Sequence, residues 1–200
     1  MPVSRSATPT RQTSAPRRRG DHTRARIIDE TVRCIIEEGF AAATAKHVAE
    51  RAGVTWGVIQ YHFGDRNGVL MAVVDDGVAK LLDSLSAADV SALPMQERIE
   101  VVVDTAWDCY SSPMSMAAFE ILRATRGLGE PSRGHLLAMN SAITRLGRLI
   151  SDDPADDGVA EVIWAALRGV VLAQMIMGTP IDWRRERRAL IDMVSHYLRR

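Results

Sequence analysis

The residues with the clearest chemical pattern lie between Ala45 and Arg66, where small, glycine and branched apolar residues recur at fixed intervals. A helix-turn-helix that reads DNA needs a small residue where its helices cross, a turn residue that tolerates positive φ, and a branched apolar anchor in the second helix. Ala49, Gly53 and Ile59 stand at this spacing. Such a unit places its second helix in the DNA major groove, where side chains hydrogen-bond to base edges. An ordinary helical hairpin could carry the same three residues, because alanine and glycine are common.

Two threonines in the same region lie where helices are expected to begin. Thr44 precedes the first helix of the pattern and Thr55 precedes the second. Threonine is a favoured N-cap residue, and the free backbone N–H groups at a helix N-terminus attract phosphate. Both positions could therefore contact a nucleic-acid backbone as well as begin a helix.

Charge is distributed unevenly along the chain, although the formal net charge is zero. The residues up to Arg26 hold seven arginines against Asp21 alone, which gives +6, so the remainder of the chain carries −6. A basic arm on an acidic body indicates a polyanion as partner for the N-terminus. A solubilising tail is the alternative interpretation.

The elements that must position these residues are helices. Apolar residues recur at the helical period from about residue 22 onward, and no segment shows the alternation of a half-buried strand. We expect an all-α protein of about nine helices, with a disordered basic arm at 1–21, a helix-turn-helix domain at 22–68 and a larger helical body at 69–200. In the body, helices are expected from Pro94 to Ser111, Pro113 to Gly127, Ser132 to Ile150, Val159 to Met177 and Asp182 to Tyr197, with Asp65 capping the helix that enters the body.

Several protein classes are not supported by the sequence. The longest uncharged stretch, from Gly169 to Ile181, is interrupted by Gly178 and Pro180, which argues against a membrane span. The N-terminus lacks an apolar signal-peptide core, so we expect a cytoplasmic protein. Cys34 and Cys109 are interpreted as two reduced thiols rather than one disulfide. We find no nucleophile–base pair, phosphate-binding loop or zinc-ligand spacing, and therefore expect no enzyme, cofactor or metal.

A longer stretch around the pattern is more specific. Residues 35–70 read IIEEGFAAATAKHVAERAGVTWGVIQYHFGDRNGVL. This closely resembles the N-terminal signature of the TetR family of transcriptional regulators: a Gly-aromatic pair, a capping Thr or Ser, an Ile/Val-Ala pair, Ala-Gly-Val, a recognition helix ending in His-Phe, and a basic residue. The resemblance runs from Thr23 to Val74. It implies a DNA-binding head joined to a helical body that senses a ligand and forms a dimer.

The resemblance also implies roles for single residues. The helix from Thr55 to Phe63 would enter the major groove, with Trp56, Gly57 and Gln60 at the positions that read base edges. Gly57 permits close backbone approach, and Gln60 could bond an adenine edge with two hydrogen bonds. The positions that usually contact the sugar-phosphate backbone are matched by Thr44, Thr55, Val58, Tyr61, His62 and Arg66, and Lys46 is a further candidate for a backbone or base contact. His62 could instead be a partly buried residue at the helix end.

This chain departs from the family pattern in four places. Gln60 stands where tyrosine is most frequent, Val58 lacks the hydroxyl of the frequent threonine, and Arg66 replaces the usual lysine while keeping its charge. Trp56 is a large residue at a reading position. These differences indicate an unusual operator sequence rather than loss of DNA binding. The arginine-rich arm is expected to reach the minor groove, and an idle arm is the alternative.

Large, adaptable apolar side chains in the middle helices could line a pocket for a bulky hydrophobic effector. Any one of them could also be ordinary core. The expected lining residues are Trp107, Tyr110, Met114, Phe119, Met139, Trp164, Gln174 and Met177.

The last two helices are expected to form a homodimer by packing against their symmetry mates as a four-helix bundle. The expected interface residues are Val162, Ala166, Gly169, Val170, Ala173, Leu190, Val194 and Tyr197. Together these features predict a repressor that binds a palindromic double-stranded DNA operator as a dimer and is released by a small hydrophobic effector. The alternatives are a DNA-binding regulator or architectural protein without an effector, and an activator in place of a repressor.

Overall fold

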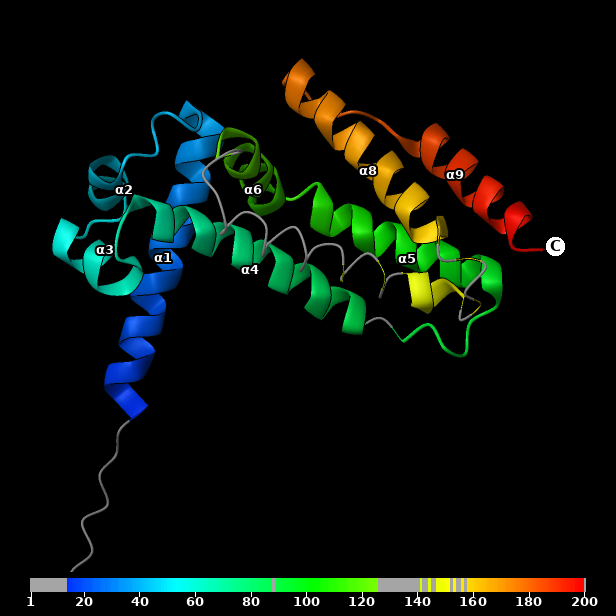
Figure 1. Cartoon of the computed structure of the whole chain (residues 1–200), viewed down its shortest axis with the longest axis horizontal. Coiled ribbons are helices and arrows are strands. Elements are labelled where there is room, and N and C mark those ends of the chain that lie inside the picture. Colours follow the sequence, from blue (N-terminus) through cyan, green and yellow to red (C-terminus); the bar gives the residue numbers. More distant parts are fainter. Residues whose placement is uncertain are drawn as a thin grey trace, which may run out of the picture.

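The computed structural model describes residues 14–87, 89–125, 141, 144, 147–151, 153, 156 and 158–199. Within these ranges the regular elements are helices and no strand occurs, which confirms the predicted all-α class. Figure 1 shows the N-terminal helices grouped as a head at one end and the later helices grouped as a body at the other. The helices are α1 (Ser14–Glu38), α2 (Ala45–Arg51), α3 (Trp56–Phe63), α4 (Arg66–Ala87), α5 (Met95–Tyr110), α6 (Pro113–Ala124), α8 (Gly158–Met177) and α9 (Arg184–Tyr197).

The head is held together by apolar side chains from α1, α2, α3 and the start of α4. Ile27, Ile28 and Ile59 are almost completely buried in this core. Helix caps set the boundaries of its helices: the Thr44 hydroxyl accepts a hydrogen bond from the His47 backbone N–H at 3.2 Å. The predicted cap at Asp65 is also confirmed, because its carboxylate accepts from the Gly68 N–H at 2.8 Å.

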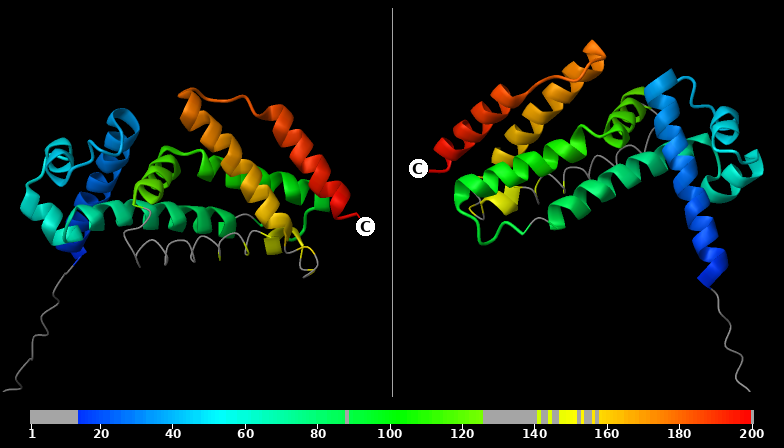
Figure 2. Two further views of the ribbon diagram at one scale, coloured as in Figure 1. Left: turned by 45° about the horizontal axis from the view of Figure 1, so that its top comes forward. Right: turned by 180° about the vertical axis from the view of Figure 1, so that it is seen from behind.

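Helix α1 begins earlier than the sequence predicts. We expected disorder up to residue 21, but the helix starts at Ser14, so only residues 1–13 of the predicted arm lie outside the described part of the chain. Pro16 suits the first turn of a helix, where its missing N–H has no partner to lose. Further along, Arg24 pairs with Asp76 of α4 at 3.4 Å and lies over the Phe63 ring. These contacts fix α1 against the head, and Figure 2 shows its first turns projecting beyond it.

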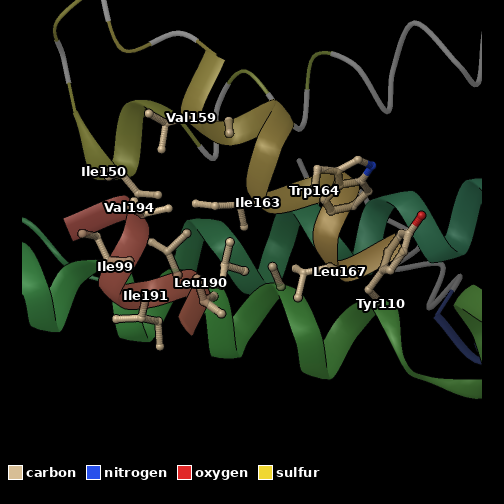
Figure 3. Close-up of a cluster of buried hydrophobic side chains, with 14 of the residues drawn as sticks. Ile99, Tyr110, Ile150, Val159, Ile163, Trp164, Leu167, Leu190, Ile191 and Val194 are labelled. Atoms are coloured by element: carbon tan, nitrogen blue, oxygen red, sulfur yellow. The ribbon is translucent and has the colours of Figure 1, made fainter. Parts of the chain in front are cut away.

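The body packs α5, α8, α9 and the distal half of α4 around a second apolar core. Trp164, Ile163 and Leu167 of α8 are its central buried residues, and Figure 3 shows them facing α5. Arg187 of α9 donates two hydrogen bonds to the Asp104 carboxylate of α5, at 2.5 and 2.6 Å. This pair holds α9 along α5.

The predicted boundaries in the body are largely confirmed. Helices α5, α6 and α8 begin and end within three residues of expectation. The N-cap of α9 is Trp183 rather than Asp182, although the Asp182 carboxylate still accepts from the Arg184 N–H at 3.2 Å. Most of the helix expected from Ser132 to Ile150 falls outside the described residues.

Helix α6 lies between the two cores. Its Met114, Ala117 and Ile121 belong to the core of the head, while Phe119 packs against the core of the body. Helix α6 contacts α1 and α4 as well as α5. Like α4, it therefore packs into both cores and links the body to the head.

Candidate DNA-binding surface and ligand cavity

The turn between α2 and α3 has the geometry that the sequence predicts. Ala49 and Ile59 are buried, and Gly53 adopts a φ of +60°. The Val54 N–H closes the turn by donating to the Ala49 carbonyl at 2.9 Å. Because an L-residue rarely adopts this φ, glycine at position 53 allows α3 to cross α2 closely.

The solvent side of α3 carries residues expected to contact bases, Trp56, Gly57 and Gln60, together with Tyr61, which is expected to contact the sugar-phosphate backbone. Trp56 is 45% exposed and Tyr61 is 84% exposed, unusually high values for aromatic side chains in a folded protein. Gly57 and Gln60 are exposed beside them, whereas Val58 and His62 are half-buried. An apolar, aromatic and amide surface on a short helix is suited to major-groove contact.

The two threonines differ in what their hydroxyls do. Thr44 caps α2, so its oxygen already accepts a backbone hydrogen bond. Thr55 occupies the N-cap position of α3, but its side chain makes no capping hydrogen bond, which corrects the expectation of a side-chain cap there. The Thr55 hydroxyl is therefore available, together with the first N–H groups of α3, to bind a phosphate.

The Arg66 side chain makes its contacts within the protein rather than with solvent. Its guanidinium donates to the Ala43 carbonyl at 2.6 Å and to the Phe40 carbonyl at 3.1 Å, and lies 4.7 Å from the Phe40 ring centroid. These contacts fix the loop that ends in Thr44. By contrast, Lys46 is largely exposed, with its ammonium 3.9 Å from Glu50.

The start of α1 contributes residues that the motif did not reveal. Gly20, Thr23 and Arg26 of α1 face Tyr61 and His62 of α3 across a surface hollow of about 830 Å³. The density of arginines before position 27 was the one sequence signal for this side of the surface. The basic N-terminal part of α1 therefore lies beside α3 along this hollow.

A polar network joins the end of α1 to α2. Arg51 donates to Glu38 at 2.5 Å and to Glu37 at 2.7 Å, and the His47 ring lies 2.9 Å from Glu38. The His47 and Arg51 hydrogen bonds hold the pKa of the Glu38 carboxyl below its usual range. Cys34, Glu38 and His47 also bring three potential metal ligands within 4.8 Å of one another. Because Glu38 already makes hydrogen bonds to both His47 and Arg51, we interpret these residues as a structural link between α1 and α2 rather than as a metal site.

A cavity of about 60 Å³ lies between α4, α5, α6 and α8. It contains three of the predicted lining residues: Tyr110, Phe119 and Trp164. The aromatic rings pack together, with centroids 4.5 Å apart for Tyr110 and Trp164 and 5.2 Å apart for Tyr110 and Phe119. The lining residues that sequence reasoning missed are Val74, Gly77, Val78, Leu81, Cys109, Ser115, Ala118 and Leu122.

The other predicted pocket residues lie elsewhere. Trp107 stacks on Trp183 with centroids 4.2 Å apart, and Met114 is buried in the core of the head. The Gln174 amide oxygen accepts from the Ile181 N–H at 3.0 Å, so this side chain stabilises the loop before α9. Met177 is 65% exposed, and Met139 falls outside the described residues. These side chains face the core or solvent rather than the cavity. Residue spacing defines the apolar side of a helix, but not how the helix is rotated about its axis relative to the cavity.

Helix α8 has apolar residues around most of its circumference. One side is buried in the core, while Val162, Leu172 and Ile176 are exposed on the other. By length and composition it is long and apolar enough to cross a membrane, the only such helix among the described residues, but core helices pass the same test and it carries Glu161 and Arg168.

The residues predicted for a dimer interface divide between this exposed side and the core. Gly169 is exposed, whereas Ala166, Val170, Ala173 and Tyr197 are partly exposed. Leu190 and Val194 are buried within the chain itself, although they line a surface groove of about 370 Å³ together with Val162, Met193 and Tyr197. The groove between α8 and α9 is thus open to solvent and apolar.

Comparison with known proteins agrees with the head geometry. Residues 27–73 match the family model described as "Bacterial regulatory proteins, tetR family". HTH-type transcriptional regulator BetI of Escherichia coli O17:K52:H18 (strain UMN026 / ExPEC) is 36% identical over 88 residues, so the match spans 42% of this chain and only 45% of that relative. BetI of Escherichia coli (strain K12) is 27% identical over 190 residues, which cover 88% of this chain and 93% of that protein.

Solved structures share the whole fold. The fatty acid degradation regulator FadR from Bacillus halodurans superposes with a TM-score of 0.71 at 17% identity, covering 85% of this chain and 96% of that one. FadR from Bacillus subtilis in complex with stearoyl-CoA gives a TM-score of 0.67 at 13% identity, with coverage of 85% and 96%. The chain therefore shares the fold of these regulators. The head, over residues 27–73, is similar to the TetR family of regulators.

Proposed function

We propose that this protein is a transcriptional repressor of the TetR type. It would bind a palindromic operator as a homodimer and leave the DNA when a small hydrophobic effector enters the cavity beside Tyr110 and Trp164. The observation that carries the proposal is the exposed face of α3, where Trp56, Gln60 and Tyr61 stand free of the core. Aromatic surface of this kind is costly to leave in water and suits contact with base edges and sugars. The dimer would act on DNA in the cytoplasm.

The proposed dimer is supported by the two-sided apolar character of α8. A helix that is apolar all round is normally buried all round. Val162, Leu172 and Ile176, together with Met193 of α9, offer the surface that a second copy would cover. Residues 162, 165, 169, 172 and 176 recur at alternating steps of three and four, the spacing of a helix–helix seam. Two heads joined in this way present two recognition helices to half-sites one turn of DNA apart.

The proposed response to an effector is supported by the position of α6. Ala118, Phe119 and Leu122 line the cavity, while Met114, Ala117 and Ile121 of the same helix pack into the head core. A cavity of about 60 Å³ has little more room than one or two waters need, so a larger ligand must displace its walls. Movement of α6 would then shift α1 and α4, and with them the separation of the two recognition helices. FadR from Bacillus subtilis, which shares this fold, is solved in complex with stearoyl-CoA, a ligand that carries a long apolar acyl chain.

The experiment is a gel shift with DNA from upstream of the protein's own gene, in excess non-specific competitor and over a range of salt. We expect a competitor-resistant complex of two protomers, whose affinity falls with salt as phosphate contacts are screened. Alanine at Trp56 or Gln60 is expected to alter sequence preference more than overall affinity. Sequence-blind binding by the unaltered protein at every site selected from genomic DNA would overturn the proposal. The same complex then serves to screen compounds for release.

A further inference from the structure

The hollow beside α3 follows one whole side of that helix. Its lining residues on α3 run from Thr55 at the N-cap to His62 in the last turn, with Val58 between them at helical spacing. Trp56 and Gln60, which are expected to read bases, are not among the lining residues. Helix α3 therefore presents two distinct sides, one for base edges and one that faces α1.

Helix α1 forms the opposite wall of the hollow. Gly20, Thr23 and Arg26 recur there at steps of three, which places them along one side of α1. The two helices come close at Gly20, where an added Cβ would lie 3.9 Å from Cε1 of His62. A helix in the major groove has a sugar-phosphate strand on either side of it. If α3 enters the groove, one of these strands must pass on the side that faces α1, and that side is the hollow.

The charges around the hollow suit a phosphate. Arg26 is exposed, and no ion pair joins it to any residue that the structure describes. None of the described lining residues is acidic, and the exposed Asp21 of α1 does not line the hollow. On the wall formed by α3, the Thr55 hydroxyl makes no capping hydrogen bond and lies beside the first N–H groups of the helix, which favour anions.

The other basic residues expected at the DNA already have partners. Arg66 donates to two backbone carbonyls of the loop before α2, and the Lys46 ammonium lies 3.9 Å from a carboxylate oxygen of Glu50. Neutralisation of phosphates by basic side chains supplies much of the affinity of a protein for DNA. Arg26 remains available for this contact, on the wall opposite α3.

We propose that the hollow between α1 and α3 holds one sugar-phosphate strand of the operator duplex, and that Arg26 binds a phosphate of this strand. The inference rests on the proposed function, because it adds a contact to the same protein–DNA complex. Phosphates are alike at every base pair, so the contact adds affinity for all sequences. It fixes the orientation of α3 in the groove without reading a base.

The first test measures Arg26→Gln by fluorescence anisotropy with two labelled duplexes, one containing the operator and one of unrelated sequence, over a range of salt. We expect the dissociation constants for both duplexes to rise by the same factor, roughly tenfold, as loss of one charged hydrogen bond implies. The slope of log Kd against log salt should fall by about 0.9, because one phosphate contact fewer releases counterions. Arg26→Lys keeps the charge and should keep the slope.

The matched control is Arg33→Gln, which removes the same charge from the same helix. Arg33 lies about two turns further along α1 than Arg26, outside the hollow, and pairs with Glu30 at 2.9 Å. Its replacement should leave the affinity and the salt slope for both duplexes unchanged. Both glutamine variants should melt at the temperature of the unaltered protein, since both arginines are exposed.

A second pair of variants tests the hollow without altering Arg26. Gly20→Gln and Gly20→Glu place side chains of equal size in the hollow, and the Cβ meets only an ordinary contact with His62. The glutamate should weaken binding of both duplexes more than the glutamine does, because its charge repels the phosphates of the bound strand. Equal binding by these two variants would place the strand outside the hollow and overturn the inference.

Three other results would overturn it as well: an unchanged salt slope for Arg26→Gln, a weakening confined to the operator duplex, or an equal loss in Arg33→Gln. If the unaltered protein shows no preference for any operator, the proposed function fails. The effect of Arg26→Gln on the unrelated duplex can still be measured in that case, so the two proposals fail separately.

Discussion

Replacing Gly57 and Gly68 by alanine, one at a time, separates the role of the DNA-binding surface from that of the scaffold. Gly57 is exposed in α3, and a Cβ added there would have its nearest neighbour, the Thr55 hydroxyl oxygen, at 3.8 Å. Gly68 lies at the start of α4, where a Cβ would stand 1.8 Å from the Phe63 carbonyl oxygen and 2.9 Å from its carbon. The same methyl group is therefore tolerated at one position and excluded at the other.

The expected magnitudes have opposite signs. Alanine at position 57 meets no clash and removes the conformational freedom of glycine, so it should stabilise the protein by about 0.5–1 kcal/mol. Alanine at position 68 must push the end of α3 away from α4, because its neighbour is backbone that cannot rotate aside. Forced overpacking of this kind costs about 1–3 kcal/mol.

Urea unfolding measures stability, and fluorescence anisotropy with a labelled operator measures affinity. Gly57→Ala should unfold at higher urea yet bind the operator more weakly, because the added methyl stands where α3 approaches the DNA. Gly68→Ala should lose stability and affinity together. Operator binding by Gly57→Ala at full strength would refute the close approach, and an undiminished stability of Gly68→Ala would refute the geometry of the α3–α4 junction.

Three further predictions concern Tyr110, Arg66 and the two cysteines. Burial raises the pKa of Tyr110 to about 12, so its ionisation should lower the free energy of unfolding as the pH rises from 10 towards 12, by roughly 2–3 kcal/mol in total. Tyr110→Phe should not show this loss when the free energy of unfolding is measured by urea titration at a series of pH values. Arg66→Ala should lower the melting temperature and weaken binding to all operators alike, since Arg66 fixes the loop before Thr44; loss of affinity at unchanged stability would instead indicate direct phosphate contact. Thiol alkylation should occur at Cys109 rather than at buried Cys34, whose pKa burial raises, and a cavity ligand should slow it; mass spectrometry that finds Cys34 modified first would contradict this.

The head could be predicted closely because its signals are local. Gly53, Ile59 and Thr44 each act within one turn or one cap, and the motif fixes their spacing. The role of Arg66 could not be derived in this way, because its partners, the carbonyls of Phe40 and Ala43, are brought to it only by the packing of α4 beneath the loop.

The body was harder because helical periodicity defines faces but not partners. Trp107 and Tyr110 both lie on α5, yet the first stacks on Trp183 and the second borders the cavity. Gly77 lines the cavity through the absence of a side chain, a contribution for which apolar periodicity gives no signal. The early start of α1 was missed because the turns from Ser14 to Asp21 are polar and arginine-rich and carry no apolar stripe.

The shared use of α6 has a consequence for how this regulator can evolve. Substitutions that enlarge or reshape the cavity at Ala118, Phe119 or Leu122 act on a helix whose other residues, Met114 and Ile121, set the position of the head. Under the proposed function, a lineage that acquires a new ligand would also change how tightly it represses in the absence of any ligand. Selection for specificity and selection for basal expression operate on the same few side chains, and adaptation of one is followed by compensating change in the other.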